Sequence, residues 1–271
     1  MSALHTLAVG SAGPRVAFLH GLFGQGRNWA QIAKALSGAQ GTDARALLVD
    51  LPDHGRSPWS QEPSFIRYAE AVARTLEQSA PGERWTLVGH SLGGKTAMVL
   101  ALTHPALIER LAVVDIAPKG YGDLHRFAEY IAAMQALPLD RLHSRADAEE
   151  IFARDVPDPG VRAFLLQNLR RHGSAFSWQV NLAMVARDAA RGPDSQIAAF
   201  PSEVLRLPPY PGPVLWIVGE RSGYVDDEDS ARMRALFPSV RKLTVKGAGH
   251  WVHTDAPEVT VAALRRFIGA H

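Results

Sequence analysis

The chain has 271 residues, of which 46% are hydrophobic and 21% charged, a composition typical of a globular protein and not of a disordered one. Its formal charge of +2 and its isolated arginine pairs at residues 170–171 and 265–266 argue against a nucleic-acid-binding face, which needs clustered basic residues. The sequence has no cysteine, which excludes disulfides and thiolate metal sites, and its histidines lack the spacing of metal ligands.

The length suits one α/β domain that carries an insertion. No apolar segment approaches the ~20 residues that span a bilayer, and the N-terminus lacks a basic start followed by a hydrophobic block. We therefore expect a cytoplasmic protein without a membrane span, and the lack of cysteine agrees with that compartment.

The first informative element is an apolar strand predicted at residues 16–19. It leads into HGLFG at residues 20–24, a turn rich enough in glycine to point a backbone N–H toward a neighbouring site. We expect that N–H to come from Leu22, with Phe23 as the alternative. His20 is expected to be a hydrogen-bonded structural histidine. A strand at residues 46–50 and a helix at residues 65–78 are predicted next.

A strand predicted at residues 85–88 runs into GHSLG at residues 89–93, and the segment after it is predicted to be a helix. This pattern places Ser91 on a sharp strand-to-helix turn, whose flanking positions must be very small, as Gly89 and Gly93 are. The turn also puts the Ser91 hydroxyl at a helix N-terminus, which favours negative charge. Ser91 is the expected nucleophile, and the N–H groups of Leu92 and Leu22 are the expected oxyanion hole.

The acid of a catalytic triad is expected after one of two strands. A strand at residues 111–114 ends in Asp115, and a carboxylate at the end of a buried apolar strand needs a partner, so Asp115 is the first candidate. The more usual place for the acid in such a fold follows the next strand, at residues 214–218, but Ser222 occupies it. Asp226 and Asp227 lie a few residues beyond and remain the alternative.

The alternation of strands and helices predicts a mainly parallel sheet with helices on both faces. It is interrupted by an insertion at residues 118–211, so the predicted core comprises residues 1–117 and 212–271. Within the insertion, helices are predicted at residues 124–137, 146–154 and 161–171, with no convincing strand. The insertion is expected to form a helical lid over Ser91.

The last predicted strand, at residues 242–245, is followed by GAGH at residues 247–250. A loop of this kind delivers the histidine of a serine-hydrolase triad, and the order of serine before histidine excludes the chymotrypsin-like arrangement. His250 is therefore the expected general base, and Asp115 is expected to orient it. The predicted chemistry passes through an acyl-enzyme on Ser91 and requires no cofactor.

These segments together resemble the α/β-hydrolase superfamily and, more narrowly, the YbfF-type esterases and their mitochondrial abhydrolase-domain relatives. The resemblance runs from about residue 13 to about residue 268. It implies the α/β-hydrolase fold, an acid after the strand that Asp115 ends, and hydrolysis of short acyl esters or acyl thioesters. The segments that carry it are HGLFG (20–24), DLPDHGRS (50–57), GHSLGGKTAM (89–98), VDIAP (114–118), LLQNL (165–169), WQVNL (178–182) and GAGHWVH (247–253).

The substrate pocket is expected to include Phe23, Lys95, Trp178 and Trp251, with Tyr121 as a further candidate. Lys95 lies one turn into the helix after Ser91, where it is expected either to contact an anionic substrate or to form a structural ion pair. The expected partner is a small-molecule ester or thioester.

Two other functions are compatible with the same fold. A lyase of the menaquinone-pathway type uses the same triad without net hydrolysis, but the insertion motifs favour the esterase. A noncatalytic binding protein would be expected to lack a member of the triad, and none is missing here. Epoxide hydrolases and dehalogenases are excluded because they need an aspartate where Ser91 stands.

Overall fold

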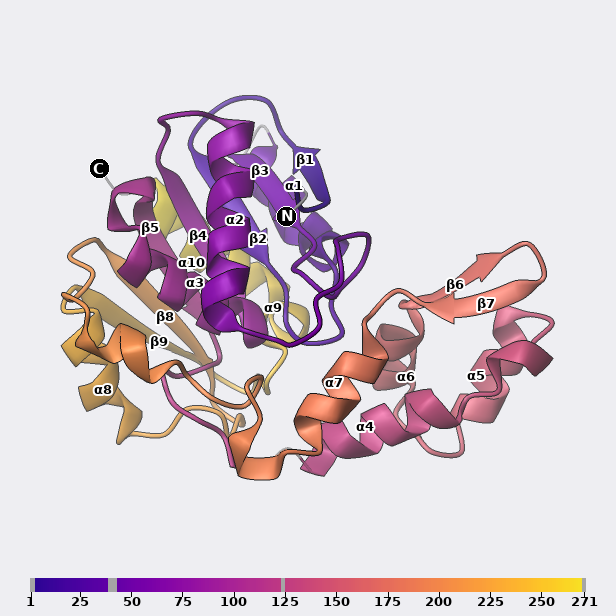
Figure 1. The fold of residues 1–271 in the computed structure, drawn as a ribbon. Coiled ribbons are helices and arrows are strands. Elements are labelled where there is room, and N and C mark those ends of the chain that lie inside the picture. The colour runs from indigo at the N-terminus through magenta and orange to yellow at the C-terminus, as the bar shows by residue number, and fades with distance from the viewer. Residues whose placement is uncertain (1–2, 39–42, 123–124, 270–271) are drawn as a thin grey trace.

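The structure, a computed structural model, describes residues 3–38, 43–122 and 125–269. Within these residues seven strands form a sheet with the order β1-β3-β2-β4-β5-β8-β9, in which β1 runs antiparallel to β3 and the other neighbours are parallel. The mainly parallel sheet is thus confirmed (Figure 1). The strands are β1 (Thr6–Val9), β2 (Arg15–Leu19), β3 (Arg45–Val49), β4 (Trp85–His90), β5 (Ile108–Val114), β8 (Val214–Gly219) and β9 (Val240–Val245).

Helices cover both faces of this sheet, as predicted. Alternate side chains of a strand point to opposite faces. Ala17 and Leu19 of β2 accordingly belong to a hydrophobic cluster with α2, α3 and α8, whereas Val16 and Phe18 belong to a second cluster with α1, α9 and α10. The bounds of these helices are α1 (Ala30–Ser37), α2 (Phe65–Ser79), α3 (Leu92–Thr103), α8 (Asp229–Leu236), α9 (Val252–Asp255) and α10 (Pro257–Ile268).

The insertion lies between β5 and β8, and Figure 1 shows most of it gathered on one side of the core. It contains α4 (His125–Ala136), α5 (Arg145–Phe152), α6 (Pro159–Leu166) and α7 (Leu182–Ala189), and a hairpin of β6 (Leu169–His172) and β7 (Ala175–Trp178). Leu124, the predicted first residue of the first of these helices, lies outside the described residues.

The hairpin corrects the expectation that the insertion has no strand. The helix predicted at residues 161–171 ends at Leu166, and the residues after it form β6. Gly173 has a φ of +63°, which glycine adopts without the penalty that a side chain carries, and it turns the chain so that β7 pairs antiparallel with β6.

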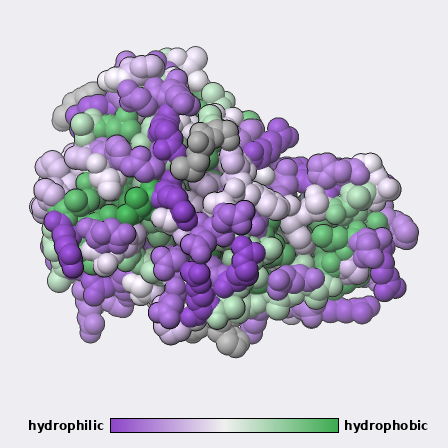
Figure 2. Space-filling view, viewed as in Figure 1, coloured by the Kyte–Doolittle hydropathy of each residue, from purple (hydrophilic) through white to green (hydrophobic). Residues whose placement is uncertain are grey.

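The face of the molecule in Figure 2 is mostly hydrophilic, with separate hydrophobic areas on the core and on the projecting insertion. Among the described residues, no helix is long and apolar enough to cross a membrane. Because β2, β4, β5 and β8 are parallel, the loops that follow them meet at one edge of the sheet, where α/β proteins usually bind their ligands.

Candidate active site

Ser91 stands on the turn between β4 and α3 with φ +52° and ψ −116°. Side chains are rarely found in this backbone region, and such strain is typical of functional sites. A Cβ atom on Gly89 would collide with the backbone of Gly93, and one on Gly93 would collide with the backbone of Leu19. The two glycines are therefore required by close backbone packing around the turn.

The loop after β2 lies beside this turn. The N–H of Gly24 donates to the carbonyl of Gly21 (2.9 Å), which closes a tight turn in which Phe23 has a φ of +61°. Leu22 lines the same two cavities as Ser91. In the described part of the chain, the N–H groups of Leu22 and Leu92 donate to no carbonyl in the loops, turns and caps. These two N–H groups stay the candidate donors to an oxyanion.

His250 contacts the carboxylate that follows β5. Its Nδ1 lies 2.8 Å from Oδ2 of Asp115, which is fully buried, and the side chain of Ser222 donates to the same oxygen. The N–H of Gly219 donates to Oδ1 (2.9 Å). Because a carboxylate only accepts, Nδ1 is assigned the proton, which leaves Nε2 of a neutral His250 as an acceptor.

The alternative acids lie elsewhere. Asp226 is 57% exposed and accepts from Lys119 Nζ at 2.8 Å, and Asp227 is fully exposed with its oxygen 3.7 Å from Lys242 Nζ. Neither forms an ion pair with His250 within the described residues. Of the three carboxylates considered, Asp115 is the one in contact with the histidine.

Two aromatic neighbours of His250 were missed in the sequence. The ring of Tyr224 stacks on it with the centroids 3.8 Å apart, and His90 Nε2 lies 2.8 Å from the His250 carbonyl. Burial lowers the pKa of His90 well below its ordinary value, so His90 is neutral and donates this bond. No hydrogen bond joins Ser91 and His250 in the residues that the structure describes, but both line one cavity.

Two small cavities adjoin Ser91, of about 30 and about 10 Å³. Of the predicted pocket residues, Phe23, Lys95, Trp251 and Tyr121 line one or the other. Trp178 lines neither and instead donates from Nε1 to the carbonyl of Met134 (3.2 Å). The prediction missed several lining residues, most of them on the insertion: Ile116, Phe127, Tyr130, Phe164, Ile197, Ala198 and Tyr224.

A family model described as the alpha/beta hydrolase fold matches residues 14–257. The chain belongs to the α/β-hydrolase family. This confirms the fold and the resemblance derived from the sequence.

Several esterases and lipases are similar to this α/β hydrolase. The sn-1-specific diacylglycerol lipase ABHD11 of Mus musculus is 40% identical over 94% of this chain and 81% of that protein. Esterase YbfF of Escherichia coli (strain K12) is 29% identical over 93% and 92%. A solved structure of a marine microorganism esterase has a TM-score of 0.89 at 29% identity and covers 98% of this chain and 99% of its own. The chain is thus a carboxylesterase-type member of the family.

Lys95 of the hydrolase is buried and does not form the predicted ion pair. Its Nζ donates to the carbonyls of Ala198 (2.5 Å) and Ala199 (2.7 Å) on the insertion, and it lies 4.7 Å from the centroid of the Tyr121 ring. No carboxylate lies within ion-pair distance among the described residues. Burial lowers the pKa of Lys95 from its ordinary 10.5 to about 7.

The unfolding free energy of the protein minus that of a Lys95→Met variant is expected to rise with pH between about 7 and 10.5. In this window the unfolded chain holds a proton on Lys95 that the folded chain does not, so a rise in pH favours the folded state. Methionine has no ionisable group, so the variant lacks this contribution to the pH dependence of the unfolding free energy. Urea denaturation of both proteins at about pH 7 and about pH 10 measures the effect, and a difference independent of pH would contradict it.

His20 has the structural role that the sequence predicted. Its Nε2 accepts from the N–H of Leu51 (3.0 Å), so Nδ1 carries the proton and donates to the carbonyl of Gly21 (2.8 Å). Burial lowers its pKa to about 3. A neutral His20 thereby supports the turn that contains Leu22.

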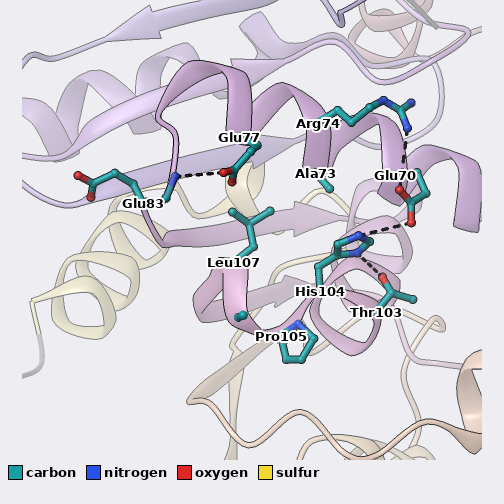
Figure 3. A pocket seen from close by; sticks show the side chains of 11 residues that line it. Glu70, Ala73, Arg74, Glu77, Glu83, Thr103, His104, Pro105 and Leu107 are labelled. Carbon is teal, nitrogen blue, oxygen red and sulfur yellow. Dashed lines mark hydrogen bonds and ion pairs between the residues drawn. The ribbon is translucent and has the colours of Figure 1, made fainter.

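A larger cavity, of about 620 Å³, lies at the far end of α3 (Figure 3). On its wall, Glu70 of α2 is within ion-pair distance of Arg74 and of His104, the residue that follows α3. Because α3 has 12 residues, about 18 Å separates this cavity from Ser91. We assign it no part in the reaction.

Proposed function

We propose that the chain is a serine hydrolase that cleaves carboxylic esters, and acyl thioesters, through Ser91, His250 and Asp115. The observation that carries the proposal is the 2.8 Å contact between His250 Nδ1 and the buried Asp115 carboxylate, beside a serine on a strained strand-to-helix turn. The names of the ABHD11 and YbfF relatives support ester substrates.

In the proposed reaction His250 Nε2 removes the proton of Ser91 while Oγ attacks the acyl carbon. The negative charge that forms on the acyl oxygen is stabilised by the N–H groups of Leu92 and Leu22. His250 then gives its proton to the leaving alkoxide or thiolate, and an ester remains on Ser91. Water, deprotonated by His250, attacks this ester and releases the acid. Throughout, Asp115 holds the imidazole in one tautomer and stabilises its protonated form.

We further propose that the insertion, residues 118–211, acts as a lid. Its residues Phe127, Phe164 and Ile197 line the cavities at Ser91. Cavities of about 30 and about 10 Å³ hold no more than one to a few water molecules. In this closed arrangement the enzyme accommodates short acyl groups, and longer ones require the insertion to move.

Ile197→Ala is expected to shift the preferred p-nitrophenyl ester toward longer acyl chains by about two carbons, because it enlarges the cavity beside Ser91. Trp178→Ala is the control: it removes a partly buried indole of the same insertion that does not line the cavity. It should lower the melting temperature and leave the chain-length profile unchanged. If Trp178→Ala changed the chain-length profile and Ile197→Ala changed only the melting temperature, this cavity would not be the one that receives the acyl chain.

The proposed function is tested by incubating the protein with p-nitrophenyl butyrate and with butyryl-coenzyme A and measuring both products. Hydrolysis releases butyric acid in the same amount as nitrophenol or free thiol. Release of the leaving group without free acid would indicate acyl transfer to another acceptor. No release, together with no labelling by a fluorophosphonate, would favour a binding protein, and turnover of a menaquinone-pathway substrate alone would favour the lyase.

A further inference from the structure

The two insertion motifs, LLQNL at residues 165–169 and WQVNL at residues 178–182, have no role in the proposed reaction. Each contains an asparagine that is buried against the core, Asn168 in the first and Asn181 in the second. Asn168 precedes β6 and Asn181 follows β7, so both lie beyond the open end of the hairpin, and they bind different loops of the core. Their partners show what each of them stabilises.

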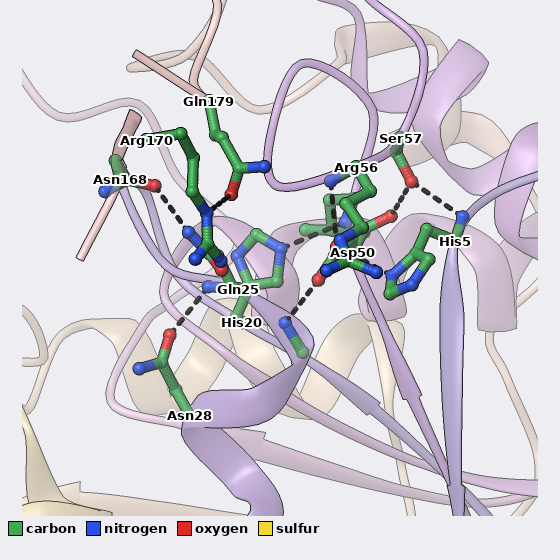
Figure 4. Close-up of polar contacts among 12 residues, drawn as sticks. His5, His20, Gln25, Asn28, Asp50, Arg56, Ser57, Asn168, Arg170 and Gln179 are labelled. Carbon is green, nitrogen blue, oxygen red and sulfur yellow. Dashed lines mark hydrogen bonds and ion pairs between the residues drawn. The ribbon is translucent and has the colours of Figure 1, made fainter. Parts of the chain in front are cut away.

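Asn168 holds the loop that follows β2. Its Nδ2 donates to the carbonyl of Phe23 (2.7 Å) and to that of Leu165 (3.2 Å), and its Oδ1 accepts from Nε2 of Gln25 (3.0 Å). Figure 4 shows the contact between Asn168 and Gln25. Asn168 is fully buried, and its hydrogen bonds with Phe23 and Gln25 are both to the loop after β2. The neighbouring Gln167 also donates to the Phe23 carbonyl, at 3.4 Å.

The loop held by Asn168 carries the proposed oxyanion N–H of Leu22. Phe23 occupies the turn position that needs a positive φ, a position that usually takes glycine. A phenylalanine there is strained by about 1 kcal/mol or more and keeps its conformation only if its surroundings fix it. Hydrogen bonds from Asn168 and Gln167 to the Phe23 carbonyl supply this restraint from outside the loop.

We propose that Asn168 is a positioning residue that holds the Leu22–Phe23 turn in the shape that binds the oxyanion. The inference rests on the proposed function. It makes the oxyanion hole dependent on the insertion: when the insertion is docked, the Phe23 carbonyl is held and the N–H groups beside Ser91 are aligned. Asn168 acts through the turn and touches neither cavity at Ser91.

Asn181 provides a matched control. It is also a buried asparagine of the insertion, and its Nδ2 donates to Asp53 Oδ1 (2.9 Å) and to the carbonyl of Ser60 (2.9 Å). Its backbone N–H donates to the carbonyl of Asp53 (2.8 Å). These bonds attach the insertion to the loop after β3 and not to the turn at Phe23. Loss of Asn181 therefore loosens the insertion without releasing that turn directly.

The test compares Asn168→Ala and Asn181→Ala with p-nitrophenyl acetate, a substrate with a short acyl group. We expect Asn168→Ala to lower kcat by roughly 10- to 100-fold with KM within about threefold, because a displaced donor stabilises the transition state more than the ground state. Asn181→Ala should keep kcat within about threefold. Propylboronic acid forms a serine adduct that presents an oxyanion. Its dissociation constant should rise in Asn168→Ala by about the same factor as kcat/KM falls.

Asn168→Asp is a second variant in case alanine prevents folding. It keeps the shape and the acceptor for Gln25 but replaces the donor to the Phe23 carbonyl with an oxygen, so the same loss of kcat is expected. Equal losses in the variants of Asn168 and Asn181, or a change in KM alone, would overturn the positioning role. If the unmodified protein hydrolyses no ester, the proposed function itself fails. If it does and Asn168→Ala matches it, only the inference about Asn168 is wrong.

Discussion

Ser91→Ala is expected to lower ester turnover by about 10⁶ and to leave the fold intact, since removal of a triad nucleophile typically has an effect of this size. Alanine removes only the hydroxyl, which has no hydrogen-bond partner among the described residues, so no structural contact is lost. Turnover of p-nitrophenyl butyrate measures the effect, and thermal denaturation measures the stability.

The result is informative only if the variant folds. We expect its melting temperature to equal or exceed that of the unmodified protein, because the strained serine at φ +52° is a site of function and not of stability. Turnover that survives in a well-folded Ser91→Ala protein would show that the nucleophile lies elsewhere.

Asp115→Asn is expected to lower turnover by as much as ~10⁴, because an amide can present its N–H to His250 and hold the imidazole in the wrong tautomer. Both oxygens of Asp115 accept hydrogen bonds. Oδ2 accepts from His250 Nδ1 and from the Ser222 hydroxyl, and Oδ1 accepts from the N–H of Gly219. Steady-state kinetics of the purified variant, with the ester concentration raised to saturation, measure the loss in kcat.

Asp226→Asn is the matched control for this loss. Asp226 is an exposed carboxylate bound to Lys119, and its change should keep turnover within about tenfold of the unmodified enzyme. If Asp226→Asn lost more activity than Asp115→Asn, the acid would have to be assigned to the later loop.

Much of the site could be predicted from the sequence because its residues stand at strand ends. A parallel sheet brings the loops after its strands to one edge, so Ser91, Asp115 and His250 could be placed together from the order of strands alone. Asp115 could be preferred over Asp226 because a charge next to a buried strand needs partners. The structure supplies those partners in Gly219, Ser222 and His250.

The hairpin of the insertion was missed although a signal for it was present. Gly173 and Ser174 lie between β6 and β7, and a glycine followed by serine between two short strands is a recognised hairpin turn. The pattern that begins at residue 161 predicts a helix to residue 171, but the helix ends at Leu166 and residues 169–172 pair with β7. Local periodicity does not mark where a helix stops when no strong cap or proline follows it.

The pocket could not be predicted with the same accuracy because its walls are formed by contacts between distant segments. The sequence predicts that Trp178, as an aromatic residue of the insertion, lines the pocket, yet its indole donates to the carbonyl of Met134. Phe127 and Ile197, which do line it, look in the sequence like ordinary core residues of helices and loops. The role of Asn168 could not be predicted either, because its partners Phe23 and Gln25 lie more than 140 residues away in the sequence.

The most direct test of the account is to react the protein with a fluorophosphonate, digest it and locate the adduct by mass spectrometry. The account predicts about one adduct per chain, on the peptide that contains Ser91, and its formation should be slowed by a competing ester. An adduct on a different residue, or no adduct in a protein that hydrolyses esters, would contradict the proposal that Ser91 is the nucleophile.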